Sequence, residues 1–274
     1  MKLFFKKTGD GKPFIILHGL FGMSDNWMTL AKQFAENGFS CYTVDQRNHG
    51  RSGHSEEFNY HVMADDLAEL MQSENISSAN FIGHSMGGKT AMFFAVMHPD
   101  KTEKLIVADI SPRYFEPHHD SVIAAIKSVD LDEITSRKEA EEKLRISIDD
   151  EATVQFLLKN LYWKEMKDCD KYGAVEVKKE IGESEKKLAW RFNLTAIEKN
   201  IKAVGEALPI GTQFNKPVLF VKGEKSGYIT SEDATLIKEH FPLAIIKSIP
   251  KAGHWVHAEN PGAFKKTVLE FLID

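Results

Sequence analysis

Short runs of apolar residues alternate along the chain with longer stretches whose apolar residues recur at helical spacing. The short runs are rich in Val, Ile, Leu and Phe, and turn-forming residues bound them. Near-continuous apolar runs of this kind are typical of parallel strands that are buried on both faces of a sheet. We therefore predict a first strand within residues 1–7 and further strands over residues 14–18, 39–45, 79–83, 104–109, 218–223 and 244–249.

Helix-length segments connect the first of these strands, which predicts an α/β fold: a mostly parallel central sheet with helices on both faces. These helices are expected over residues 26–37, 60–73, 85–97 and 261–272. The alternation stops near residue 112, and helical segments then follow one another over 121–129, 136–146, 151–162 and 183–203. The sequence thus predicts a core of residues 1–112 and 211–274, interrupted by a helical insert over 113–210.

The insert is rich in charged residues but also contains five large aromatic residues: Phe156, Tyr162, Trp163, Trp190 and Phe192. Packing within the insert is one interpretation of these rings. The other is a helical cap, or lid, that presents an apolar underside to a site at the carboxyl end of the sheet.

A serine stands between a predicted strand and a predicted helix, in the motif Gly83-His84-Ser85-Met86-Gly87-Gly88. The bare Gly-x-Ser-x-Gly pattern arises often by chance, so its structural context decides its meaning. A serine on a sharp strand-to-helix turn is exposed at the edge of the sheet, where free amides at the start of the helix stabilise negative charge. Ser85 is therefore the predicted nucleophile.

A serine hydroxyl is a weak nucleophile until a base takes its proton. The segment Lys251-Ala252-Gly253-His254-Trp255-Val256-His257 follows the last predicted strand. This position places His254 at the same edge of the sheet as Ser85, so we predict that His254 is the general base. His257 is expected to help hold the loop.

The turn His18-Gly19-Leu20-Phe21-Gly22 ends an early strand. A backbone amide in this turn can face the amide that follows the nucleophile. The N–H groups of Leu20 and Met86 are thus predicted to form an oxyanion hole, in which each donor contributes about 2.7 to 4 kcal/mol.

The loop Asp45-Gln46-Arg47-Asn48-His49-Gly50-Arg51-Ser52 gathers charged and turn-forming residues after a strand. Its side chains can satisfy backbone groups of the loop itself, which favours an architectural role. Contact with substrate is the alternative.

Composition and charge narrow the class of protein. The formal net charge of -5 gives no basic surface for nucleic acid. Cys41 and Cys169 lie far apart and form no metal or redox motif. There is no apolar run long enough to span a membrane and no signal-peptide pattern at the N-terminus, so a cytoplasmic location is expected.

In this order, the His-Gly turn, the Asp-x-Arg-x-x-Gly-x-Ser loop, the Gly-x-Ser-x-Gly motif, the helical insert and the late Gly-His pair resemble the α/β-hydrolase superfamily. The first three motifs look most like those of the YbfF-type esterases, which are small hydrolases with a helical cap. The resemblance covers nearly the whole chain and is weakest in the insert. It implies hydrolysis of carboxylic esters, or of thioesters, without a cofactor or metal.

The chain departs from this pattern at the acid of the expected triad. In many relatives the strand before the last ends in Gly-x-x-Asp, whereas here the segment reads Gly223-Glu224-Lys225-Ser226. Asp109 ends the strand that follows the nucleophile's helix, at the same edge as Ser85, and similar hydrolases carry the acid there. Asp109 is therefore the predicted acid, with Ser226 donating a hydrogen bond to it.

Glu224 is the main competitor of Asp109, because it is a carboxylate close to the usual place, although two residues early. The predicted activity is attack of Ser85 on a small-molecule ester or thioester through an acyl-enzyme. Hydrolysis of a carbon-carbon bond on the same fold and non-catalytic binding of a small molecule are the alternatives, since fold alone does not fix function.

Overall fold

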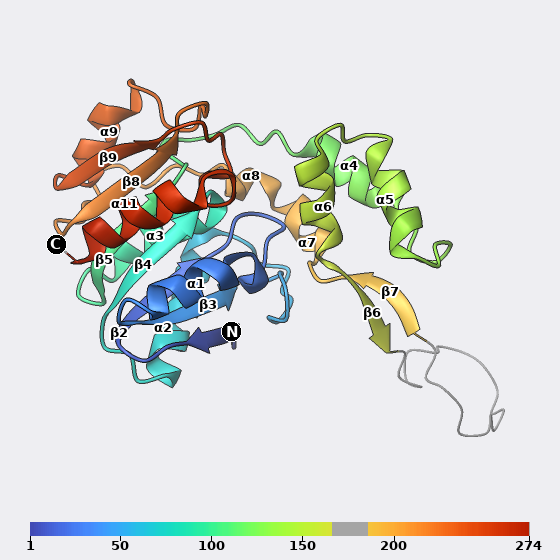
Figure 1. Ribbon diagram of the computed structural model, residues 1–274, viewed down its shortest axis with the longest axis horizontal. Coiled ribbons are helices and arrows are strands. Elements are labelled where there is room, and N and C mark those ends of the chain that lie inside the picture. The colour runs from blue at the N-terminus through green and yellow to red at the C-terminus, as the bar shows by residue number, and fades with distance from the viewer. Residues whose placement is uncertain (166–185, 274) are drawn as a thin grey trace. The chain divides into compact units, whose positions relative to one another are not determined.

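The computed structural model describes residues 1–165 and 186–273, which group into two compact units. The larger unit contains Met1–Pro117 and Asn193–Asp274, and the smaller unit is His118–Phe192. Both are drawn in Figure 1, and each is described by itself. The insert expected over 113–210 extends beyond the smaller unit, because residues 113–117 and 193–210 group with the larger one.

The larger unit is built on a seven-stranded sheet with the strand order β1-β3-β2-β4-β5-β8-β9. The strands are β1 (Phe4–Thr8), β2 (Lys12–Leu17), β3 (Phe39–Asp45), β4 (Ala79–His84), β5 (Thr102–Ala108), β8 (Val218–Gly223) and β9 (Ala244–Ile249). Only β1 runs antiparallel to its neighbour; the other neighbouring pairs are parallel. The carboxyl ends of the parallel strands therefore meet at one edge, where the predicted site residues lie.

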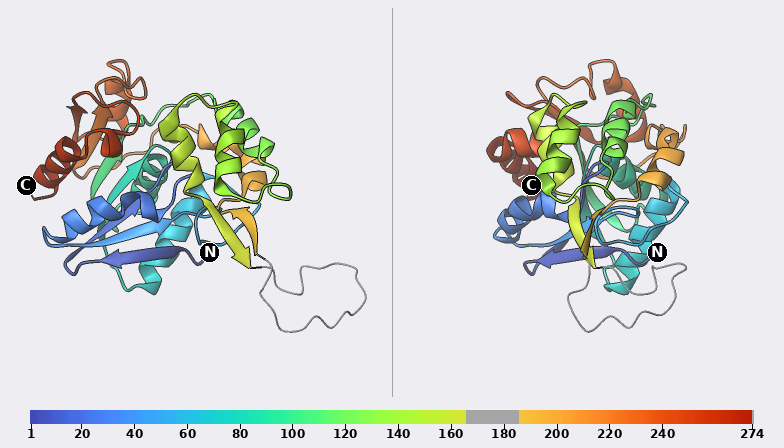
Figure 2. Two further views of the ribbon diagram at one scale, coloured as in Figure 1. Left: turned by 45° about the vertical axis from the view of Figure 1, so that its right-hand side comes forward. Right: turned by 90° about the vertical axis from the view of Figure 1, so that its right-hand side faces the viewer.

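Helices cover both faces of this sheet (Figures 1 and 2). They are α1 (Met28–Ala35), α2 (Tyr60–Ser73), α3 (Met86–Met97), α9 (Asp233–His240) and α11 (Pro261–Ile273), with short helices η1 (Ser24–Trp27), α7 (Leu194–Lys199), α8 (Ile201–Val204) and α10 (Val256–Glu259). Helix α3 is buried from residue 86 through residue 95, so the helix that follows Ser85 is surrounded by protein. The predicted fold class is confirmed.

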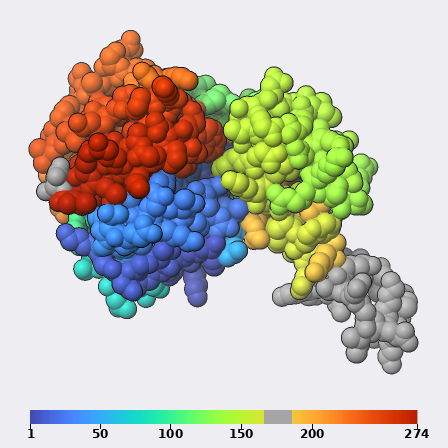
Figure 3. All heavy atoms as spheres, viewed as in Figure 1, coloured from blue at the N-terminus to red at the C-terminus, as the bar shows by residue number. Residues whose placement is uncertain are grey.

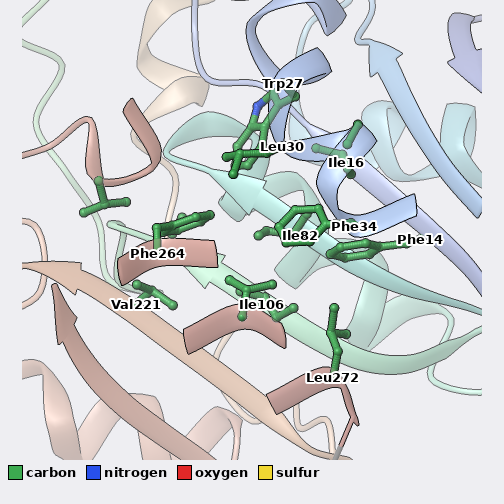
Figure 4. Packing of buried hydrophobic residues seen from close by; sticks show 14 of the residues in the cluster. Phe14, Ile16, Trp27, Leu30, Phe34, Ile82, Ile106, Val221, Phe264 and Leu272 are labelled. Atoms are coloured by element: carbon green, nitrogen blue, oxygen red, sulfur yellow. The ribbon is translucent and has the colours of Figure 1, made fainter. Parts of the chain in front are cut away.

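Alternation along the central strands sends neighbouring side chains to opposite faces of the sheet. Figure 4 shows Ile82, Ile106 and Val221 on the face where Trp27, Leu30 and Phe34 pack with Phe264 and Leu272. The adjacent Phe81 and Phe220 point the other way, with ring centroids 4.6 Å from Phe94 of α3 and 5.5 Å from Phe241. On the face of the larger unit seen in Figure 3, α1 and α11 lie side by side.

The smaller unit contains three helices and a hairpin within its described part. These are α4 (Asp120–Ser128), α5 (Arg137–Arg145), α6 (Glu151–Leu158), β6 (Leu161–Glu165) and β7 (Lys186–Trp190). Ser136 and Asp150 cap α5 and α6 by accepting from backbone amides three residues on, and apolar residues such as Leu144 and Leu157 are buried between the helices.

The helix predicted over 183–203 is wrong at residues 186–190, which form a strand, and the helix predicted over 151–162 is wrong at residues 161–162, which begin β6. Lys187 and Ala189 alternate with Leu188 and Trp190, and β6 pairs with the whole segment antiparallel, Leu161 opposite Trp190. The strand depends on that distant partner, which a helical period does not reveal. Helices α7 and α8 occupy the rest of the predicted range, whereas residues 183–185, like Cys169, lie outside the described residues.

Candidate active site

Ser85 occupies a strained turn between β4 and α3. Its backbone has φ 53° and ψ -118°, a left-handed conformation that costs a non-glycine residue about 1 to 3 kcal/mol. A Cβ on Gly83 would come within 2.0 Å of the Gly87 carbonyl oxygen, and one on Gly87 within 2.6 Å of the His18 oxygen. Only glycine fits at these two positions, so the spacing of the motif follows from close contacts between backbones.

Asp109 lies at the end of β5 and is fully buried. Its Oδ2 atom is 2.8 Å from Nδ1 of His254 and accepts a 2.5 Å hydrogen bond from the Ser226 hydroxyl. Its Oδ1 atom accepts from the Gly223 N–H group at 2.9 Å. A carboxylate only accepts, so Nδ1 of His254 carries the proton and Nε2 is left as the basic atom.

Glu224, the competing carboxylate, has another partner, and so does Asp233 near the same edge of the sheet. Glu224 accepts from the N–H group of Lys251 at 2.6 Å, which places it on the loop before His254 rather than on its imidazole. Asp233 accepts from the Ser111 hydroxyl at 2.8 Å and from the Thr230 N–H group at 2.8 Å. The structure thus brings Asp109, Ser226 and His254 together and leaves Glu224 and Asp233 in structural contacts.

Two aromatic rings flank His254 that the sequence analysis did not assign to the site. The ring of Tyr228 stacks on it at 4.1 Å between centroids, and the ring of His84 lies at 4.6 Å. His84 also donates from Nε2 to the His254 carbonyl oxygen at 2.8 Å, while burial lowers the pKa of His84 well below its usual value. His84 is therefore neutral, and this hydrogen bond ties the residue before Ser85 to the histidine loop.

His257 supports the same loop from the other side, as expected. Its ring stacks on Trp27 with centroids 4.3 Å apart, and burial lowers the pKa of His257 to about 3. Its position three residues after His254 suggested a role in holding the loop, but nothing in the sequence indicated the stack on Trp27. The contact of Tyr228, two residues after Ser226, had no comparable signal.

The turn that contains Leu20 lies beside Ser85 in space. A Cβ built on Gly19 would lie 3.5 Å from Cβ of Ser85. The turn is held by His18, whose Nε2 accepts from the Gln46 N–H group at 3.0 Å and whose Nδ1 donates to the Gly19 oxygen at 2.8 Å. Burial lowers the pKa of His18 to about 4, consistent with this neutral tautomer.

The predicted oxyanion-hole donors belong to the two turns that meet here. Met86 is the first residue of α3, whose opening amides have no intrahelical partner. Within the described part of the chain, no hydrogen bond uses the N–H group of Leu20 or Met86, and none uses the Ser85 hydroxyl.

The loop after β3 is architectural, as predicted. Asp45 accepts from the N–H groups of Ser24 at 2.6 Å and Arg51 at 2.9 Å. Arg47 forms a buried bidentate pair with Asp66 at 2.6 and 2.9 Å. A Cβ on Gly50, whose φ is 59°, would lie 2.2 Å from the Asp45 carboxylate, so glycine is required there.

Arg47→Met is expected to lower the free energy of unfolding by about 1.5 to 3 kcal/mol, because the Asp66 carboxylate loses its buried bidentate partner and keeps only the N-terminal amino group of Met1 as a cation. Urea denaturation monitored by circular dichroism measures the change. Lys138→Met, which removes the exposed pair of Lys138 with Glu142, is the matched control and should leave the midpoint unchanged. An Arg47→Met midpoint equal to that of the control would contradict the prediction.

Comparison with known proteins identifies the family. Residues 12–261 match the model of the α/β-hydrolase fold family. The chain is 36% identical to the sn-1-specific diacylglycerol lipase ABHD11 of Danio rerio, over 98% of this chain and 80% of that protein. It is 33% identical to Esterase YbfF of Escherichia coli, over 97% of this chain and 94% of that protein. Among solved structures, a marine microorganism esterase matches with 44% identity and a TM-score of 0.88, over 99% of both chains.

The chain belongs to the α/β-hydrolase family. Relatives named esterase and lipase confirm the expectation of a YbfF-like hydrolase of the ester-hydrolase class. No group of three or more His, Cys, Asp or Glu residues placed to hold a metal ion occurs among the described residues. The same residues include no helix that is both long and apolar enough to cross a membrane.

Proposed function

We propose that this enzyme hydrolyses small-molecule carboxylic esters through an acyl-enzyme, with a triad of Ser85, His254 and Asp109. The observation that carries the proposal is the hydrogen bond between Nδ1 of His254 and Oδ2 of Asp109, at the edge of the sheet where the turn of Ser85 stands. This bond orients the imidazole and stabilises the imidazolium that forms when Nε2 takes the proton of the serine.

In the first half of the reaction, Ser85 Oγ attacks the ester carbonyl while His254 takes its proton. The carbonyl oxygen becomes negative in the tetrahedral intermediate, where the N–H groups of Leu20 and Met86 donate to it. Collapse breaks the bond to the alcohol, which leaves with the proton from His254. Water activated by His254 then attacks the acyl-enzyme and releases the acid, and no cofactor enters these steps.

Two further features support the choice of acid. Ser226 stands where many relatives carry the acid, and its hydroxyl donates to Oδ2 of Asp109, the oxygen that also faces His254. The Gly223 amide occupies the other oxygen. Both bonds fix the rotamer of the carboxylate and stabilise its charge, so we assign Ser226 as the support of the acid.

Labelling with a fluorophosphonate, together with initial rates on aryl esters of increasing acyl length and an acyl thioester, tests this function. Covalent modification at Ser85 and measurable ester hydrolysis are expected. A thioester also has a carbonyl open to attack, so comparable rates on it would extend the substrate class. Labelling with negligible rates on every ester would favour carbon-carbon bond hydrolysis, and absence of labelling would favour a binding protein.

We further propose that the insert acts as a cap that selects among acyl groups. Its described part places large apolar side chains on a mostly charged unit: Phe156 lies on α6, and Trp163 on β6 is 49% exposed. Large aromatic rings on a charged unit could contact a bound acyl group and so distinguish acyl lengths. Trp163→Ala or Phe156→Ala should therefore change the preference among acyl lengths more than it changes the rate on the acetate ester.

Ratios of kcat/KM across the aryl ester series measure this preference. Ile146→Ala is the matched control, because Ile146 is 79% exposed on the same unit and lacks an aromatic ring. It should leave the ratios unchanged. If Trp163→Ala changed kcat/KM equally for all acyl lengths, or lost its circular dichroism signal, the aromatic residues would instead serve packing within the insert.

A further inference from the structure

A buried lysine that the proposed mechanism does not use lies on the helix of the nucleophile. Lys89 follows Ser85 by one turn of α3 and is 1% exposed. Its Nζ atom is within hydrogen-bond distance of three main-chain carbonyl oxygens, those of Pro112 at 3.2 Å, Arg113 at 2.5 Å and Glu206 at 2.8 Å. An ammonium group has three N–H donors, so the three oxygens satisfy it completely.

The three carbonyls belong to the two chain segments that connect the larger unit to the smaller one. Pro112 and Arg113 lie on the segment that leaves β5, and Glu206 lies on the segment that returns toward β8. Both segments are part of the larger unit up to Pro117 and from Asn193 onward. One side chain on α3 therefore binds the outgoing and the returning connection at once.

The two connections are also joined directly to each other. The Phe115 N–H group donates to the Gly205 oxygen at 2.8 Å, and the Leu208 N–H group donates to the Pro112 oxygen at 2.9 Å. A Cβ on Gly205 would lie 1.9 Å from the Phe115 oxygen, so the two backbones touch at this point. Lys89 donates to carbonyl oxygens of both segments, and it thereby joins both of them to α3.

The charge of Lys89 is costly where it lies. Burial, with the Arg113 guanidinium as the next cause, lowers the pKa of Lys89 to about 7, whereas the carboxylates of Glu206 and Asp233 act in the opposite direction. A methionine of similar length would avoid this cost, but it would leave three carbonyl oxygens without their shared donor. The arrangement is therefore better explained by the joining of segments than by stability alone.

We propose that Lys89 is a positioning residue that fastens both connections of the smaller unit to the helix of the nucleophile. It touches no reacting atom. Its effect on catalysis rests on the proposed function, because these two connections join the proposed cap to the rest of the chain. Loss of Lys89 should weaken the binding of esters with long acyl groups and leave the reaction at Ser85 unchanged.

Limited trypsin digestion of Lys89→Met tests the fastening without reference to activity. Trypsin can cut after Arg113 and Lys202, one in each connection. We expect cleavage there, identified by mass spectrometry, to be about tenfold faster than in the wild type, since local opening loses a charged hydrogen-bond donor. Lys104→Met is the matched control, because Lys104 donates to the carbonyls of Phe271 and Leu272, away from the connections.

Kinetics separate positioning from general destabilisation. In Lys89→Met we expect KM for the longest accepted ester to rise about threefold to tenfold, with kcat and the rate of fluorophosphonate labelling changed less than about twofold. Equal trypsin cleavage in Lys89→Met and the wild type would overturn the proposal, as would a fall in labelling rate as large as the rise in KM. Failure of the wild type to be labelled would instead remove the proposed function and leave the trypsin result standing.

Hydrogen exchange of the wild type covers the case in which Lys89→Met does not fold. If Lys89 joins the connections to α3, the amides of Phe115 and Leu208 should exchange in the same slow class as those of the second half of α3. Exchange of these two amides at the rate of exposed loops would overturn the proposal.

Discussion

Ser85→Ala is expected to remove nearly all turnover, by up to about 10⁶-fold, because Ser85 is the proposed nucleophile and the residues of a triad act as a unit. The change deletes one hydroxyl at a partly exposed turn and keeps the Cβ, so folding and substrate binding should survive. Rates on the best aryl ester, with the circular dichroism spectrum and the dissociation constant of the product acid, measure both halves of this expectation.

Ser128→Ala is a suitable control for Ser85→Ala. The Ser128 hydroxyl donates to a carbonyl of its own helix in the smaller unit, so its loss should leave turnover unchanged. If a pure Ser85→Ala preparation kept more than a few per cent of wild-type activity, another residue would be the nucleophile. Fluorophosphonate labelling that persisted in this variant would identify that residue.

Asp109→Asn is expected to lower turnover by about 10⁴-fold. An asparagine amide can donate to Nδ1 of His254, which would move the imidazole proton to Nε2 and remove the base. The carboxamide also gives the imidazolium no negative charge. The measurement is kcat with saturating aryl ester.

Two parallel variants separate the candidates for the acid. Glu224→Gln should change turnover little, because the Glu224 side chain binds the backbone of Lys251. Ser226→Ala should give an intermediate loss, since Asp109 would keep His254 and Gly223 as partners but lose one donor. A severe loss in Glu224→Gln beside near-normal Asp109→Asn would move the acid to the later strand.

The sequence predicted the core better than the insert, for a physical reason. Strands β3, β8 and β9 begin and end at the expected residues. For β3 and β8, continuous apolar runs bounded by turns leave few alternatives, and both strands are buried nearly throughout. The expectation of burial on both faces is wrong for β9, an edge strand whose four middle residues are exposed. Strand β7 was missed because its partner β6 lies across residues 166–185, and neither segment forms a ladder alone. The spacing of apolar residues indicates which face of a segment is buried, but it does not indicate which distant segment pairs with it.

The candidate site shows the same division. Ser85, His254 and Asp109 could be predicted because each follows a strand, and parallel strands bring such positions to one edge. Ser226 could be predicted as well, because it stands at the position where many relatives carry the acid. In contrast, the stacking of Tyr228 on His254 and the reach of Lys89 to three carbonyls depend on contacts between segments far apart in the chain. Neither residue belongs to a pattern of local spacing.

The left-handed backbone at Ser85 and Asp109, with φ of 53° and 54°, sets a limit on how this enzyme can be stabilised. Glycine adopts such a conformation freely, and non-glycine residues there cost about 1 to 3 kcal/mol each. A screen for heat resistance alone would therefore select glycine at both positions and yield proteins that are more stable but inactive. Selection for stability has to be coupled to selection for turnover, because Ser85 and Asp109, two of the six non-glycine residues with positive φ in the described part of the chain, carry side chains that the proposed chemistry requires.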